Sequence, residues 1–76
     1  MANRRIVDAK GSFCPGPLME LIAAIKTVEI GDVIEVLSTD KGSALEIPEW
    51  IKKVKHEHLG TTEENGVWHV IVKRMK

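Results

Sequence analysis

The chain has 76 residues, of which 43% are hydrophobic and 29% are charged, a composition typical of one folded domain spanning residues 1–76. A domain of this size has little room for a deep substrate cavity. With 11 basic and 11 acidic residues the net charge is zero, so no global field attracts nucleic acid. No apolar segment suits a signal peptide or a membrane span, and a single cysteine excludes a disulfide framework. We therefore expect a cytoplasmic protein.

The apolar pattern predicts alternating strands and helices. Residues 5–9 are β-branched and are followed by a turn signal, which predicts a first strand. Between residues 18 and 28, apolar residues recur at three- and four-residue spacing, which predicts an amphipathic helix that closes at residues 29–32. Residues 33–39 have few polar interruptions, as is typical of a central strand that pairs in parallel with the first.

A second helix follows, and its start is open between two positions. Ser43 and Glu46 have the spacing of a capping box, which would make Ser43 the N-cap. Pro48 would then remove one backbone hydrogen bond in the next turn, so the regular helix could instead begin at Pro48. The sequence does not decide between these two starts.

Asn65-Gly66 is a strong signal for a β-hairpin, and it separates strand-like segments at residues 61–64 and 67–73. The element order is then β-α-β-α-β-β. With a right-handed first crossover, this order places both helices on one face of a four-stranded mixed sheet. The sequence therefore predicts the α+β class, as a two-layer α/β sandwich.

The loop between the first strand and the first helix contains the only cysteine. Its sequence is Gly11-Ser12-Phe13-Cys14-Pro15-Gly16-Pro17. If Cys14 is the N-cap, Pro15 and Pro17 fall in the first turn, where a missing N–H costs nothing. The positive end of the helix would then lower the thiol pKa below its free value of about 8.5. We expect Gly11, Pro15, Gly16 and Pro17 to support the cysteine loop.

Cys14 is the candidate reactive residue. Proline stands where a Cys-x-x-Cys oxidoreductase has its second cysteine, so no other thiol of the chain can close onto Cys14. A persulfide there would last until a thiol of another molecule attacked it. A buried structural cysteine is the alternative. The convergence of Gly11, two prolines and a helix start on an exposed loop favours the reactive cysteine.

Asp40 and Lys41 are candidates for the border of the site. They follow the second predicted strand, at the sheet edge where open α/β sheets place their sites. Asp40 alternatively serves only to turn the chain into the second helix. For Asp8, at the end of the first strand, we expect a mainly structural role.

The loop resembles the motif of the TusA/SirA family of sulfur carriers, Asp-x-x-Gly-x-x-Cys-Pro-x-Pro. The matching residues are Asp8, Gly11, Cys14, Pro15 and Pro17. The resemblance extends over nearly the whole chain, through Asp40, Ile47-Pro48, His56-Glu57 and the element order. Phe13 and Gly16 depart from the pattern, because family members often have a basic or polar residue at the first position and glutamate at the second.

The resemblance implies a persulfide on Cys14, loaded by a cysteine desulfurase or a rhodanese-like donor and unloaded onto a DsrE-like or other acceptor protein. Such a protein takes part in a sulfur relay and is not a stand-alone enzyme, and we expect no cofactor. Relatives serve tRNA thiolation, molybdenum cofactor supply, sulfur oxidation or selenium metabolism, and the sequence does not choose among these. We expect a monomer, because a carrier presents one small loop to successive partners, with no membrane or direct nucleic-acid partner.

The sequence leaves two alternatives to a sulfur carrier. The first is a small RNA- or protein-binding module of the same fold with a structural cysteine. Zero net charge and few aromatic residues argue against it, since Trp50 and Trp68 are expected to face the core. The second is a stand-alone thiol enzyme. The three histidines, His56, His58 and His69, are expected on the surface at a helix end and on a strand, and they do not form a zinc pattern with one thiol.

Overall fold

The structure is a computed structural model that describes residues 4–76. Its elements, in chain order, are β1 (Arg4–Asp8), α1 (Gly16–Ile25), β2 (Val33–Ser38), α2 (Lys41–Lys53), β3 (Glu57–Glu64) and β4 (Val67–Lys73). The strands form one sheet in the order β1-β2-β4-β3, with β1 parallel to β2 and the other two pairs antiparallel. Within the described residues, no helix is both long enough and apolar enough to cross a membrane.

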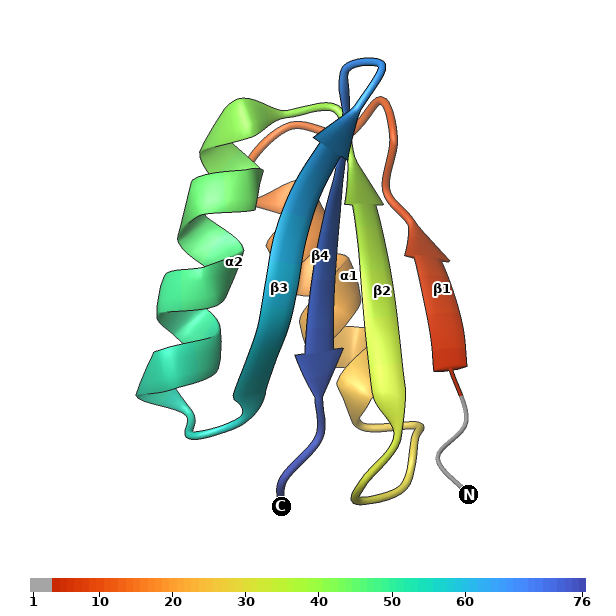
Figure 1. The fold of residues 1–76 in the computed structure, drawn as a ribbon, viewed down its shortest axis with the longest axis vertical. Coiled ribbons are helices and arrows are strands. Elements are labelled where there is room, and N and C mark those ends of the chain that lie inside the picture. The colour runs from red at the N-terminus through yellow and green to blue at the C-terminus, as the bar shows by residue number, and fades with distance from the viewer. Residues whose placement is uncertain (1–3) are drawn as a thin grey trace.

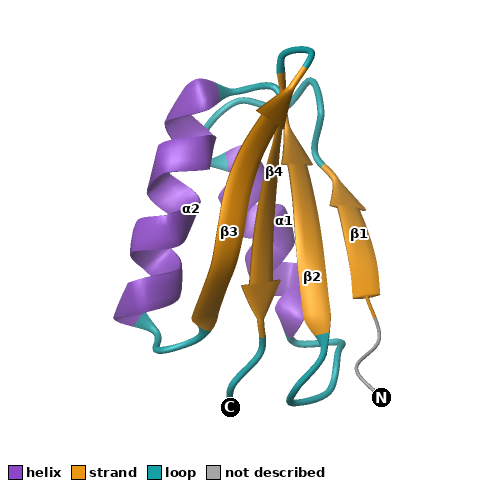
Figure 2. Cartoon of the chain, viewed as in Figure 1, coloured by secondary structure: helices purple, strands orange, loops and turns teal. Residues whose placement is uncertain are grey.

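Both helices lie against the same face of the sheet (Figures 1 and 2). This arrangement confirms the predicted two-layer α+β sandwich with a four-stranded mixed sheet. The central position of β2, parallel to β1, is also as predicted. Among residues 4–76, no helix covers the opposite face of the sheet.

The core lies between the helices and the sheet. In β2 every second residue is buried, as expected for a strand with one covered face. The largest fully buried aliphatic side chains are Leu21 from α1, Ile34 and Val36 from β2, Ile47 and Ile51 from α2, and Val70 and Val72 from β4. Burying these side chains supplies most of the free energy that a domain of this size gains on folding.

The predicted β3–β4 hairpin is confirmed, but β3 is longer than predicted. Asn65 and Gly66 both have positive φ, of 52° and 80°, as the tight turn requires. The sequence predicts a strand only over residues 61–64, whereas pairing with β4 continues back to Glu57. An irregularity between His58 and Gly60 absorbs one extra residue, so the pairing continues through Gly60 to Glu57.

α1 begins two residues earlier and ends earlier than the apolar stripe at residues 18–28 predicts. Its last turn tightens because the backbone N–H of Thr27 donates to the Ala24 carbonyl at 2.9 Å, a bond to the third residue before it. The apolar stripe continues past this turn, and Val28 still packs against the core. Periodicity therefore located the buried face correctly and the helix end incorrectly.

Neither predicted start of α2 is correct. Asp40 is the N-cap, in an extended conformation, and its Oδ2 accepts hydrogen bonds from the Ser43 N–H at 3.0 Å and the Ser43 hydroxyl at 2.8 Å. The helix then runs from Lys41 through Pro48 without a break, at the cost of the backbone bond that proline cannot donate. Because Ser43 is not the cap, Glu46 is not part of a capping box.

The two tryptophans differ in their contact with the core. Trp50 is partly buried and packs against the core, as predicted. Trp68 lies on the helix-covered face, as predicted, because it alternates with the buried Val70 and Val72, but it is partly exposed and is not part of the core cluster. Trp68 is the second residue of β4 and pairs with the last residue of β2, Ser38, at the end of the sheet where the core layer stops.

Candidate functional site

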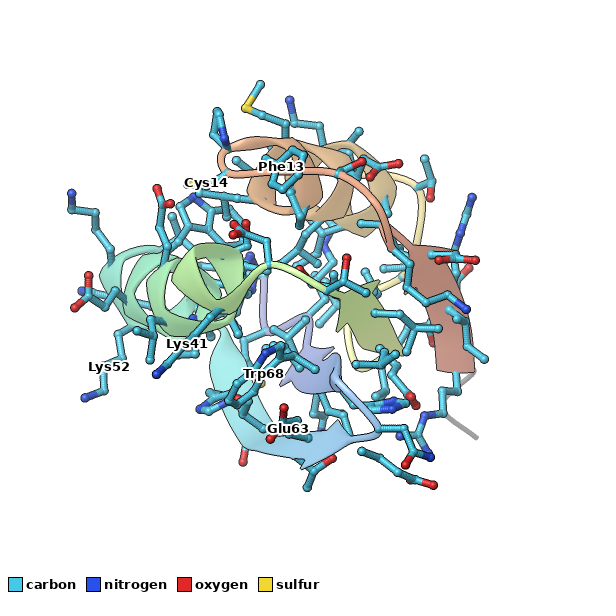
Figure 3. All side chains as sticks on the ribbon, turned by 90° about the horizontal axis from the view of Figure 1, so that it is seen from above. Phe13, Cys14, Lys41, Lys52, Glu63 and Trp68 are labelled. Atoms are coloured by element: carbon cyan, nitrogen blue, oxygen red, sulfur yellow. The ribbon has the colours of Figure 1, made fainter. Side chains whose placement is uncertain are left out.

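The cysteine loop lies at one end of the sandwich. The β1–α1 loop, the β2–α2 connection and the β3–β4 turn all lie at this end (Figure 1). Figure 3 looks down on it and shows Cys14 and Phe13 in the loop that leads into α1. Cys14 is exposed, and Phe13 has 80% of its surface exposed. The thiol is therefore accessible to other molecules from this end.

Gly11 turns the chain at the start of the loop. Its φ of 88° lies in the left-handed region, which side chains disfavour. Its N–H donates to the Thr39 hydroxyl at 3.0 Å, which joins the loop to the end of β2. Asp8 supports the same turn, because its Oδ1 accepts the N–H of Lys10 at 3.1 Å. Gly11 thus fixes the direction in which the loop leaves the sheet.

The residues after Cys14 begin α1, but Cys14 is not its N-cap. The N-cap is Pro15, whose carbonyl accepts the Met19 N–H at 3.0 Å, and the Cys14–Pro15 peptide bond is cis. Pro17 lies in the first turn and is buried. A Cβ on Gly16 would come within 3.2 Å of the Ser12 side chain, so the loop favours glycine there. Cys14 is thus displaced one residue outward from the predicted position.

Asp40 contacts the cysteine loop directly. Its Oδ2 accepts the backbone N–H of Cys14 at 3.0 Å, and the same oxygen caps α2 through Ser43. The hydrogen bond from the Ser43 hydroxyl is the main cause that lowers the pKa of Asp40, and the backbone N–H groups of Ser43, Cys14 and Gly42 lower it further. Both roles considered for Asp40, at the border of the cysteine and at the turn into α2, therefore occur together.

Glu46 is the residue that sequence reasoning missed. The Cys14 Sγ donates a hydrogen bond to its Oε2 at 2.6 Å. A carboxylate in this position stabilises the neutral thiol and repels a thiolate. This hydrogen bond is the largest cause that raises the pKa of Cys14; desolvation, the Glu46 charge and the Asp40 charge raise it further, whereas the Ser43 hydroxyl lowers it.

The predicted lowering of the thiol pKa is therefore wrong. A helix terminus stabilises an anion only within the first turn, and Cys14 precedes the N-cap of α1. The carboxylate at 2.6 Å outweighs this weaker effect. A sequence signal existed, since Asp40, Ser43 and Glu46 recur at a spacing of three and share one face of α2.

Lys41 is not brought to the sulfur. It is the first residue of α2 and is exposed, and in Figure 3 it lies on the other side of this helix from Cys14. Asp40 and Lys41 are adjacent in the chain, but the first turn of the helix directs them to different sides.

The histidines also lie away from the cysteine. His56 accepts the N–H of Met75 at 3.0 Å, His58 bonds to the Thr61 hydroxyl, and His69 bonds to Glu35. Among residues 4–76 there is no group of three or more histidine, cysteine, aspartate or glutamate side chains that could hold a metal ion.

A shallow groove between the two helices opens beside Glu46. It has a volume of about 250 Å³ and is lined by Leu18 of α1 and by Glu46, Glu49, Trp50 and Lys53 of α2. Two of the lining residues, Leu18 and Trp50, are apolar, and two, Glu46 and Glu49, are carboxylates of α2. The groove and the thiol therefore share one residue, Glu46.

Comparisons with known proteins agree with this fold. A solved SirA-like protein from Desulfitobacterium hafniense superposes with a TM-score of 0.82 at 23% identity, over 93% of this chain and 97% of that one, which supports the fold. A "Putative sulfur carrier protein" of Archaeoglobus fulgidus is 54% identical over 93% of this chain and 97% of its own length. The sulfur carrier protein TusA of Pseudomonas entomophila is 36% identical over 82% of this chain and 78% of its own length. The family model described as sulfurtransferase TusA matches residues 5–74, so the chain belongs to the TusA family.

Proposed function

We propose that the protein is a sulfur carrier that holds sulfur as a persulfide on Cys14, receives it from a donor protein and passes it to an acceptor protein. The observation that supports this most directly is an exposed thiol, the only one in the chain, on a loop fixed by hydrogen bonds to Thr39 and Asp40 in the connection between β2 and α2. Relatives named as sulfur carriers support the same role.

The proposed exchange is balanced in atoms and electrons. In loading, the Cys14 thiol loses its proton to solvent, and the thiolate attacks the terminal sulfur of a persulfide on the donor. The bond between the two donor sulfur atoms breaks, and its electron pair leaves on the donor cysteine, which takes up a proton. In unloading, an acceptor thiolate attacks the terminal sulfur and Cys14 is the leaving group. No external oxidant or reductant is needed.

The lack of a second cysteine matters to this chemistry. A nearby thiol would attack the persulfide and release its sulfur as sulfide, whereas here the next thiol to attack belongs to another molecule. The raised pKa of Cys14 keeps the resting thiol protonated, so it reacts slowly with random electrophiles. A reducing compartment such as the cytoplasm would preserve this free thiol.

Intact-protein mass spectrometry tests the proposal. The native protein and Cys14→Ser are incubated with cysteine and a cysteine desulfurase, or with a rhodanese and thiosulfate. We expect the native protein to gain the mass of one sulfur atom, reversibly with a thiol reductant, and the variant to gain none. No gain with either donor would contradict the proposal. RNA binding that Cys14→Ser leaves unchanged would then favour the binding-module alternative.

A further inference from the structure

We propose that Glu46 is the docking contact for the sulfur-donor protein: a lysine or arginine side chain of the docked donor pairs with the Glu46 carboxylate, withdraws it from the Cys14 thiol and so frees the thiolate for attack. This inference rests on the proposed function, and it adds to it the chemistry of the partner surface.

Glu46 contacts both the Cys14 thiol and the groove between the helices. On one side its Oε2 accepts the hydrogen bond from the Cys14 Sγ at 2.6 Å, and on the other it lines the groove between α1 and α2. Glu46 is itself partly exposed. A molecule in the groove can therefore reach the carboxylate that accepts the hydrogen bond from the thiol.

The Glu46 carboxylate forms no ion pair within residues 4–76. The ion pairs formed within residues 4–76 involve Glu35 and Asp8, and neither Glu46 nor Glu49 takes part in one. Lys53 lines the same groove without pairing with either. Two carboxylates beside one unpaired ammonium group give the groove a negative bias, which a basic side chain of a partner complements.

Apolar side chains lie beside this charge. Trp50 and Leu18 line the groove, and Phe13 and Leu45, the neighbours of Cys14 and Glu46 in the chain, are 80% and 63% exposed. An apolar surface around a charged contact excludes water and strengthens the pairing, as at the centre of protein interfaces. The donor surface that fits has a basic side chain among apolar ones.

Of the two carboxylates that face the thiol, Glu46 is the less constrained. Glu46 and Asp40 both disfavour the thiolate, and the Ser43 hydroxyl is the group that favours it. Asp40 is already engaged by Ser43 and by the backbone N–H of Cys14. Glu46 has no such second bond, so it is the group that an incoming cation can move without unfolding the cap of α2.

The first experiment needs no partner. The rate of Cys14 alkylation by iodoacetamide is measured against pH for the native protein, Glu46→Gln and the matched control Glu49→Gln, which alters the same groove without touching the sulfur. We expect Glu46→Gln to move the pH profile to lower pH and to raise the rate at neutral pH, while Glu49→Gln follows the native profile. Identical profiles for all three would overturn the proposal.

The second experiment measures docking. Sulfur uptake from a cysteine desulfurase is followed with the carrier as the varied substrate, at low and high salt. We expect Glu46→Gln to raise KM roughly three- to tenfold and to weaken its dependence on salt, as for the loss of one interfacial charge contact. Glu49→Gln should change KM less. An unchanged KM for Glu46→Gln, or an equal effect of both variants, would overturn the docking contact.

Inorganic polysulfide serves as a donor that cannot dock. We expect Glu46→Gln to take up sulfur from polysulfide at least as fast as the native protein does. Slower uptake would show that the variant impairs the chemistry or the fold, and would overturn the proposal. If the native protein takes up sulfur from neither donor, the proposed function fails together with this inference; if only the KM comparison fails, the carrier function stands and the docking contact does not.

Discussion

At the level of single residues, Asp40 joins the site to the fold. One carboxylate oxygen accepts the N–H of Cys14, the N–H of Ser43 and the Ser43 hydroxyl. The cap of α2 and the position of the cysteine loop therefore depend on the same atom. A change at Asp40 should affect stability and sulfur transfer together.

Removing this oxygen should lower stability. We expect Asp40→Ala to lower the Tm by about 4–8 °C, the range for losing a helix cap in a domain of this size, and Asp40→Asn to lower it less, because the amide still offers an oxygen. Thermal unfolding followed by circular dichroism measures both. A Tm for Asp40→Ala equal to that of the native protein would show that the cap is not stabilising.

The stability difference should also depend on pH. Because the pKa of Asp40 is lowered on folding, the unfolded state binds more protons between the two pKa values. The contribution of Asp40 is thus fully present above its unfolded pKa of about 3.9 and is lost as pH falls through the lower folded value. The Tm gap between the native protein and Asp40→Asn should narrow over this acid range. A constant gap would contradict the assignment.

At the level of secondary structure elements, the end of β4 fastens the connection between α1 and β2. The Arg74 guanidinium donates to the carbonyls of Ile25 and Val28, and the Arg74 backbone exchanges hydrogen bonds with Gly31 and Asp32. The Ile25 carbonyl belongs to the last turn of α1 and the Val28 carbonyl lies just after it, where backbone carbonyls have no partner within the helix. Arg74 therefore supplies the C-terminal cap that the helix sequence lacks.

Replacing Arg74 should lower the free energy of unfolding. We expect Arg74→Lys to lose about 1–2 kcal/mol, because the shorter lysine side chain keeps the charge but does not extend to the two carbonyls that the Arg74 Nη1 reaches. The adjacent Lys73→Ala should change stability by less than about 0.5 kcal/mol. Urea unfolding measures both. Equal effects of the two substitutions would mean that the carbonyl contacts contribute nothing specific.

At the level of the whole molecule, the two faces of the sheet differ. Ile34 in β2 is fully buried, whereas Ile6 in the neighbouring strand β1 is 61% exposed and pairs with Glu35, a residue of the face of β2 opposite to Ile34. We expect Ile34→Val to lower the free energy of unfolding by about 1 kcal/mol and Ile6→Val to change it by much less. Denaturant titration measures both. A larger effect at Ile6 would mean that the uncovered face is buried in solution.

Much of the architecture followed from the sequence, because it rests on local patterns. The alternation in residues 33–39, the Asn65-Gly66 turn and the apolar stripe of α1 each depend on residues close together in the chain, so periodicity and turn chemistry were enough to predict the sandwich. The cysteine loop was likewise evident from its glycine, prolines and single thiol.

The electrostatics of the site were decided only by the tertiary structure. Cys14 and Glu46 are 32 residues apart, and Cys14 and Asp40 are 26 apart, so both contacts depend on how α2 packs beside the cysteine loop. Because Asp40 caps α2 and the helix begins at Lys41, Glu46 lies on the face of α2 that contacts Cys14. Its carboxylate raises the pKa of the thiol, which is opposite to the predicted direction. Local sequence determines which elements form, whereas the charge that surrounds a side chain depends on residues that only folding brings together.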